Sequence, residues 1–129
     1  NALLERSDVV TLHVPGGKDN ENLFGAETFA QMKDGAILVD VARGGVVDEA
    51  ALLAALDSGK LSYAVLDVQK QEPPLEGNPL LRHPKILLTP HMASNTEESM
   101  ARMSLHAAWQ IHKVLSGEMP DWPVNRPIL

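Results

Sequence analysis

The chain has 129 residues, of which 44% are apolar and 22% charged, as is typical of one globular domain with a sizeable core. A formal net charge of −6 argues against a nucleic-acid groove, which needs clustered lysine and arginine. No apolar run approaches the roughly 20 residues that span a bilayer, and the absence of cysteine excludes disulfides, thiolate chemistry and zinc–sulfur sites. We therefore expect no nucleic-acid or membrane partner, and a reducing, cytoplasmic setting.

The first residues read as the end of a helix. The chain opens at Asn1, without a methionine or a signal-peptide pattern, on the stretch "NALLERS". We therefore expect the sequence to begin at a fragment boundary.

Four apolar runs follow at a regular pitch, at residues 8–14, 36–42, 63–68 and 85–90. They are rich in valine, leucine and isoleucine and almost continuously apolar, which is typical of strands covered on both faces. Their starts lie 28, 27 and 22 residues apart, which is roughly the length of a strand–helix–strand unit.

Two helices are predicted between the first three strands. Residues 26–35 predict a short helix that Gly35 ends. Residues 47–59 predict a clearer one, because Asp48 can cap its first turn and Gly59 can end it.

The segment before the fourth strand and the segment after it differ in character. Residues 69–84 contain four prolines and so predict a structured loop with at most one short turn. The longest helix is predicted at about 96–116, where Asn95 and Glu98 fit a capping box, and the tail 120–129 is predicted to be extended. One stripe of that helix is formed by Met100, Met103, Ala107, Ile111, Val114 and Leu115.

Strand and helix alternate, which predicts an α/β fold with a parallel sheet and right-handed crossovers. Such sheets bind ligands beyond the carboxyl ends of their strands. Arg43 follows the second predicted strand, Glu72 follows the third, which contains Asp67, and His91 follows the fourth. An arginine, a glutamate and a histidine are therefore expected at one edge of one sheet.

These residue types suit the reduction of a 2-keto acid. Histidine titrates near neutrality and can give a proton to the carbonyl oxygen. A glutamate on its other nitrogen orients the ring and favours the imidazolium, and an arginine can hold the substrate carboxylate through two hydrogen bonds. The hydride must come from a cofactor, because no side chain supplies one.

Several motifs together resemble one family. The stretches "SDVVTLHVP", "MKDGAILVDVARGGVVDEAALLAAL", "LDVQKQEPP" and "LTPHMAS" are similar to the second half of the NAD-binding domain of the D-isomer-specific 2-hydroxyacid dehydrogenases, which include phosphoglycerate dehydrogenases and glyoxylate/hydroxypyruvate reductases. The resemblance covers nearly the whole chain. It implies a partial Rossmann-type domain at residues 1–118, followed by a tail at 119–129 that leads back towards a substrate domain absent from the chain.

The resemblance also implies roles for individual residues. Arg43 matches the substrate-binding arginine, Glu72 the partner carboxylate and His91 the acid/base, whereas formate dehydrogenases carry glutamine where this chain has Glu72. The implied cofactor is NAD or NADP and the implied assembly a homodimer. His13, Val14 and Pro15 match positions beside the adenosine half of the cofactor. Val41, Ala42, Arg43 and Asp67 match positions around the nicotinamide, with Asp67 on its carboxamide, and His91 and Ala93 complete the implied cofactor contacts.

The chain departs from the family in places. Val41 stands where threonine is usual, Asp40 where asparagine is usual, and Gly16 and Gly17 follow Pro15 in place of a leucine–threonine pair. Neither a G-x-G-x-x-G fingerprint nor its acidic ribose-binding residue occurs. We therefore expect the chain alone to bind NAD poorly, to turn over nothing, and to leave the first strand with an unpaired edge.

Alternatives remain for the individual residues. His13 and Pro15 could form an ordinary turn, and the buried partner that Asp67 needs could be loop N–H groups as easily as a carboxamide. Gly44 and Gly45 could cradle a phosphate at a helix N-terminus or could serve close packing. The methionine-rich stripe fits a core or a subunit interface. The remaining histidines, which lack metal-ligand spacing, are His83, His106 and His112, so we expect no metal.

Two other classes of function stay open. A non-catalytic binding or co-repressor-like protein could use the same scaffold, although binding alone needs no proton donor. A phosphate-binding α/β protein could use the two glycines after the second strand.

Overall fold

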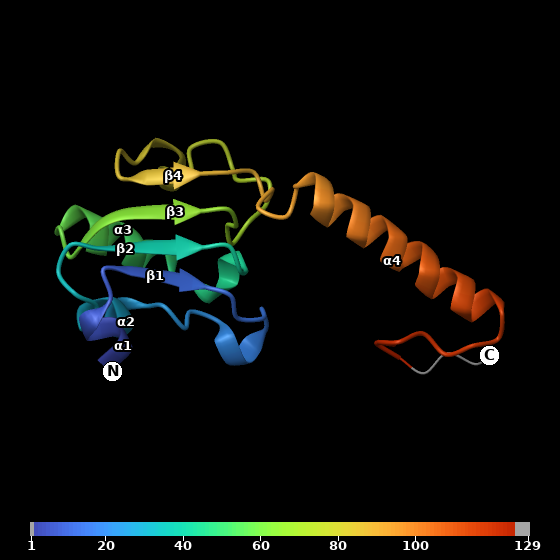
Figure 1. Cartoon of the computed structure of the whole chain (residues 1–129). Coiled ribbons are helices and arrows are strands. Elements are labelled where there is room, and N and C mark those ends of the chain that lie inside the picture. Colours follow the sequence, from blue (N-terminus) through green and yellow to red (C-terminus); the bar gives the residue numbers. More distant parts are fainter. Residues whose placement is uncertain (1, 126–129) are drawn as a thin grey trace. The chain divides into compact units, whose positions relative to one another are not determined.

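A computed structural model, which describes residues 2–125, contains one four-stranded sheet (Figure 1). The strands are β1 (Val9–Leu12), β2 (Ala36–Asp40), β3 (Leu61–Leu66) and β4 (Ile86–Leu88). Their order is β1-β2-β3-β4 and every pairing is parallel, so all four carboxyl ends meet at one edge. This confirms the predicted α/β sheet of a partial Rossmann-type domain. Among residues 2–125, the only strand that pairs with β1 is β2.

Four α-helices and three short 3₁₀ helices precede, connect or follow the strands within the described residues. The α-helices are α1 (Ala2–Arg6), α2 (Ala26–Gln31), α3 (Glu49–Asp57) and α4 (Glu97–Leu115), and the 3₁₀ helices are Lys18–Asn20, Gly44–Val46 and Pro79–Arg82. As predicted, Asp48 caps α3, because its Oδ1 accepts the N–H groups of Ala50 and Ala51 at 3.0 and 3.1 Å. The proline-rich segment holds no long helix, as predicted, and its one helical turn is Pro79–Arg82.

Three strands, β1, β2 and β4, are shorter than predicted, whereas β3 keeps its predicted length of six residues and begins earlier, at Leu61. The end of β2 shows how one strand is cut short. This strand ends at Asp40 rather than at residue 42, because the Asp40 side chain accepts the N–H of Ala42 at 2.8 Å and turns the backbone out of the sheet. At its other end, the register with β3 shifts between Ala36 and Ile37. Neither a side-chain hydrogen bond of this kind nor a register shift can be predicted from a pattern of apolar residues.

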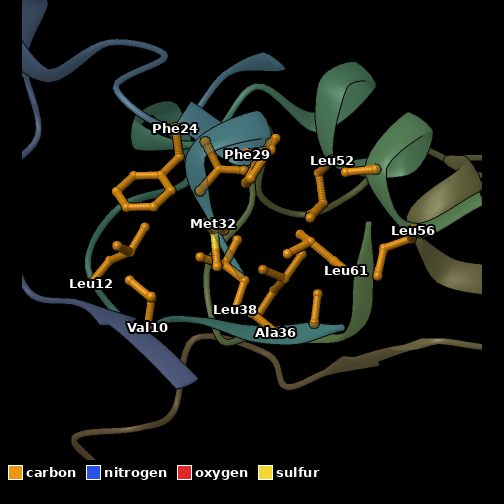
Figure 2. Close-up of a cluster of buried hydrophobic side chains, with 14 of the residues drawn as sticks. Val10, Leu12, Phe24, Phe29, Met32, Ala36, Leu38, Leu52, Leu56 and Leu61 are labelled. Carbon is orange, nitrogen blue, oxygen red and sulfur yellow. The ribbon is translucent and has the colours of Figure 1, made fainter. Parts of the chain in front are cut away.

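The core lies on one face of the sheet (Figure 2). Figure 2 shows Val10 and Leu38 of the sheet pointing towards Phe29 of α2 and Leu52 of α3, and all four are buried. Burying each such side chain contributes roughly 1.5–3 kcal/mol. On the other face, Val9 stays 53% exposed. Helices α2 and α3 therefore cover one face of the sheet, although the almost continuously apolar strands predicted cover on both faces.

The chain divides into two compact units, residues 1–93 and 94–129. In the second unit, α4 begins at Glu97 and its N-cap is Thr96, whose hydroxyl accepts the N–H of Ser99 at 3.1 Å. The predicted capping box of Asn95 and Glu98 is therefore wrong by one residue. No residue of α4 is buried, so its methionine-rich stripe forms no core here.

The described part of the tail folds back onto α4. The N–H of Asp121 donates to Oε1 of Gln110 at 2.8 Å, and the carboxylate of Asp121 also pairs with Lys113. The last part of the predicted tail, 126–129, lies outside the described residues. Within residues 2–125, no helix combines the length and apolar composition that crossing a membrane requires.

Candidate active site

His91 and Glu72 meet at the carboxyl edge of the sheet. Nδ1 of His91 lies 2.7 Å from Oε2 of Glu72. His91 follows β4 in a left-handed conformation, with φ of 51°, and its backbone N–H donates to the carbonyl oxygen of Asp67 at 2.9 Å. The loop after β3 supplies Glu72, whose Oε1 accepts the N–H of Gln69 at 2.8 Å.

The contacts of Glu72 fix which nitrogen of His91 is engaged. The hydrogen bond from His91, and then that from the Gln69 N–H, hold the pKa of Glu72 below its usual value. An ionised carboxylate only accepts hydrogen bonds, so Nδ1 of His91 carries a proton. The other ring nitrogen, Nε2, is therefore left for a reactant, as in an acid/base catalyst whose ring a carboxylate orients.

Asp67 fixes the segment that presents His91. It is 4% exposed, and one carboxylate oxygen accepts the hydroxyl of Thr89 and, at 2.8 Å, the N–H of Met92. The other accepts the N–H of Ala93, also at 2.8 Å. Burial acts to raise the pKa of Asp67, but these hydrogen bonds outweigh it, and the pKa lies below the usual value. Of the partners that the sequence left open for Asp67, loop N–H groups are present.

Arg43 lies in the turn after β2. Its Nη1 donates to the carbonyl oxygen of Ala42 at 2.7 Å. The stem of the side chain runs against Gly16, where a Cβ would lie only 3.0 Å from Cγ of Arg43. The glycine that follows Pro15 therefore makes room for the arginine. The hollow at this point, about 460 Å³, is lined by His13, Val14, Pro15, Gly16, Val41, Ala42 and Arg43.

A second, smaller hollow surrounds the histidine. Its volume is about 250 Å³, and its lining residues are Gln69, Glu72, Pro73, Pro74, Pro90 and His91. The structure therefore brings Glu72 and His91 into contact and places Arg43 in the other hollow, with five more of the predicted cofactor residues. The other three, Asp67, His91 and Ala93, do not line that hollow. Both hollows lie at the carboxyl edge, the first at the exits of β1 and β2 and the second at those of β3 and β4.

Gly44 joins these two parts of the site. A Cβ on Gly44 would lie 1.9 Å from the carbonyl carbon of Gln69, so the Arg43 turn packs directly on the peptide that precedes the Glu72 loop. Asp48 already occupies the N–H groups that begin α3. Gly44 therefore serves close packing, whereas Gly45 has open space at its Cβ position, and the phosphate cradle considered from the sequence gains no support.

Three site residues were missed from the sequence: Gln69, Thr89 and Gly16. Gln69 carried a weak signal, since it is a polar residue that closes an apolar run. It is buried, and its Oε1 has no hydrogen-bond partner among the described residues. Thr89 and Gly16 carried none, because their roles depend on Asp67 and Arg43, which lie 22 and 27 residues away in sequence.

The remaining histidines have other partners. His83 lies 3.2 Å from Asp57, and in the second unit His106 lies 3.2 Å from Nε2 of Gln110, while the ring of His112 packs on Trp109. Across residues 2–125, no three His, Asp or Glu side chains gather as metal ligands would.

Comparison with known proteins gives consistent matches. The family model for the NAD-binding domain of D-isomer-specific 2-hydroxyacid dehydrogenases matches residues 1–93. The chain is 43% identical over 127 residues to a D-3-phosphoglycerate dehydrogenase of Archaeoglobus fulgidus, covering 98% of the chain and 24% of the relative. It is 43% identical over 129 residues to a glyoxylate reductase of Thermofilum pendens, covering 100% of the chain and 38% of the relative.

A solved structure matches equally well. The crystal structure of a D-lactate dehydrogenase from Treponema pallidum superposes with a TM-score of 0.87 at 38% identity, covering 97% of this chain and 42% of the other. The chain thus spans less than half the length of each of these three proteins.

Proposed function

The chain belongs to the NAD-binding domain family of the D-isomer-specific 2-hydroxyacid dehydrogenases, and from this we propose that the protein carrying it reduces a small 2-keto acid to the 2-hydroxy acid. The observation that carries the proposal is the hydrogen bond between His91 and Glu72 at the carboxyl edge. A protein that only binds a ligand has no need of a histidine held in this way by a carboxylate.

In this proposal, His91 is the general acid. Glu72 holds Nδ1 and orients the ring, so that Nε2 gives its proton to the carbonyl oxygen as that oxygen becomes a hydroxyl. In the reverse direction, the same nitrogen takes the proton back.

Arg43 is the proposed anchor for the substrate carboxylate. One of its nitrogens is bonded to the Ala42 carbonyl, and a guanidinium has further N–H donors for the two oxygens of a carboxylate. Its permanent charge also polarises the neighbouring keto group.

The first hollow is the proposed cofactor site, for NAD or NADP. It gathers from two strand exits six of the residues that the sequence predicted: His13, Val14, Pro15, Val41, Ala42 and Arg43. Because these residues follow both β1 and β2, the hollow fits an elongated ligand that crosses the ends of the two strands. This ligand would supply the hydride. We place Ala93 and His91 at its reactive end. The role of Asp67 towards a carboxamide stays a proposal, since its carboxylate already takes three donors.

The arrangement of the whole protein is also proposed from the resemblance. We assign residues 1–118 to the NAD-binding domain and 119–129 to a connection towards a substrate domain, in a cytoplasmic homodimer. The exposed stripe of α4 offers an apolar surface for such an interface. Sedimentation of the purified protein would distinguish a dimer from a monomer.

The test is a turnover assay on the longest natural polypeptide that carries this sequence. Glyoxylate, hydroxypyruvate, pyruvate and 3-phosphohydroxypyruvate are offered in turn with NADH and with NADPH, and the loss of reduced cofactor is followed. We expect turnover of at least one keto acid with one cofactor. Absence of turnover despite saturable NADH or NADPH binding would refute the catalytic proposal and leave a binding protein. Titration of NADH into the 129-residue chain alone should give weak binding.

A further inference from the structure

Asp40 is a buried acidic residue that the proposed reaction does not use. It ends β2 with an exposed fraction of 0%. Along β2 its side chain alternates with Val39 and so shares the core face with Leu38 and Ala36. An ionised carboxylate in such surroundings is costly unless donors compensate it.

The donors around Asp40 are few compared with those around Asp67. Oδ1 of Asp40 accepts the N–H of Ala42 at 2.8 Å, whereas Oδ2 has no hydrogen-bond partner among the described residues. Asp67 takes three donors on its two oxygens. Asp40 thus accepts a hydrogen bond through one oxygen only, and a neutral side chain can also accept such a bond.

Ala42 links Asp40 to the arginine. Its N–H is held by Asp40, and its carbonyl oxygen accepts Nη1 of Arg43 at 2.7 Å. If the hold on Ala42 were lost, both the backbone that carries Arg43 and the acceptor that steadies its guanidinium would be free to shift.

We propose that Asp40 is a positioning residue for Arg43, which holds the turn 41–43 through one carboxyl oxygen, a role that asparagine can fill and alanine cannot. The inference rests on the proposed function, in which Arg43 binds the substrate carboxylate. Burial raises the pKa of Asp40, opposed by the N–H groups of Ala42 and Arg43 and by the charge of His13. A neutral acceptor at this position is consistent with that direction.

The experiment compares Asp40→Asn, Asp40→Ala and the matched control Val39→Ala, which shortens the neighbouring side chain of β2 without touching the turn. For each protein the KM of the keto acid, kcat and the Kd of NADH are measured. The hydrogen-exchange rate of the Ala42 N–H is followed separately by NMR. Exchange needs no substrate, so it reports on the turn even if no keto acid is turned over.

We expect Asp40→Asn to stay within about twofold of the wild type in KM, kcat and the Kd of NADH, and to protect the Ala42 N–H from exchange at least as well as the wild type. Asp40→Ala should raise the KM at least tenfold, with much smaller changes in kcat and in NADH affinity, and should speed exchange of the Ala42 N–H at least tenfold. Val39→Ala should do neither.

Three results would overturn the inference. One is an Asp40→Asn variant as impaired as Asp40→Ala, since the charge would then be what matters. The second is an Asp40→Ala variant whose KM and Ala42 exchange rate equal those of the wild type. The third is an Asp40→Ala variant whose changes are no larger than those of Val39→Ala. If Asp40→Ala does not fold, an unprotected Ala42 N–H in the wild type or a tenfold rise in KM for Asp40→Asn overturns it. Absence of any turnover by the wild type refutes the proposed function instead, and the exchange rates still decide the role of Asp40.

Discussion

Nδ1 of His91 lies 2.7 Å from Oε2 of Glu72, although the two residues are 19 positions apart and follow different strands. Two further contacts fix this pair. The Gln69 N–H holds the second oxygen of Glu72, and Asp67 accepts the backbone N–H of His91 and those of the two residues after it. Both side chains are thus oriented before any ligand binds, which is the arrangement that proton transfer requires.

The charge of Glu72 should stabilise the fold only above acid pH. Its pKa is lowered from the ordinary 4.5, first by the His91 hydrogen bond. The contribution is therefore present above that ordinary value and is lost as the pH falls through the lower folded pKa. Glu72→Gln should lower the free energy of unfolding by about 0–1 kcal/mol near neutral pH, because the His91–Glu72 pair is partly exposed. This difference from the wild type should disappear on acidification. Urea unfolding from about pH 6 to about pH 3 measures it.

Glu76→Gln is the control for that series, since Glu76 is an exposed carboxylate of the same loop. It should follow the wild type at every pH. A gap between the wild type and Glu72→Gln that widens on acidification would contradict the assigned direction of the Glu72 pKa.

Asp40 should show the opposite dependence on pH. Burial raises its pKa above the ordinary 3.8, so its contribution is complete below that ordinary value and is lost as the pH rises through the folded pKa. Asp40→Asn, which needs no proton, should therefore be more stable than the wild type at neutral pH, with the difference vanishing towards acid pH. Thermal unfolding of both proteins across this range tests the sign, with exposed Asp19→Asn as control. A less stable Asp40→Asn at neutral pH would show that the charged form is the favoured one.

Gly44 should tolerate no side chain. A Cβ there would lie 1.9 Å from the carbonyl carbon of Gln69, a backbone atom that cannot step aside, whereas Gly45 has open space at its Cβ position. Gly44→Ala should lower the free energy of unfolding by about 1–3 kcal/mol, as overpacked substitutions do. Gly45→Ala is the matched control and should cost well under that. Equal urea midpoints for the two variants would mean that the turn and the loop are not in close contact.

Arg43→Lys should weaken substrate binding although the charge is kept. A lysine cannot offer the two parallel N–H donors that a carboxylate accepts from a guanidinium. Losing one charge-assisted hydrogen bond predicts a keto-acid KM roughly tenfold higher, with NADH affinity nearly unchanged. Arg82→Lys, at an exposed residue of the 3₁₀ helix in the proline-rich segment, should change neither. A KM that Arg43→Lys leaves unaltered would remove Arg43 from the substrate site.

The sheet could be predicted from the sequence because its signals are local. Runs of valine, leucine and isoleucine mark buried strands wherever they occur, and Asp48 caps the helix that it directly precedes. The cap of α4 was misassigned because Asn95 and Thr96 are both good caps, and only the backbone decides between them.

The site could be predicted only in part, because its details are long-range. The strand exits of a parallel sheet converge, which was enough to bring Glu72 and His91 together. The role of Gly44 depends on the peptide of Gln69, and the bonds of Asp67 depend on a loop about 25 residues further on. Neither the contact of Gly44 nor the hydrogen bonds of Asp67 can be predicted from the spacing of residue types.

Steady-state keto-acid reduction by His91→Gln tests the central claim most directly. The variant is compared with the wild type and with His83→Gln, whose histidine pairs with Asp57 instead. With His91 as the proton donor, kcat of His91→Gln should fall by about 10²–10⁴-fold, while NADH affinity and the activity of His83→Gln stay close to those of the wild type. A kcat of His91→Gln equal to that of the wild type would contradict the account.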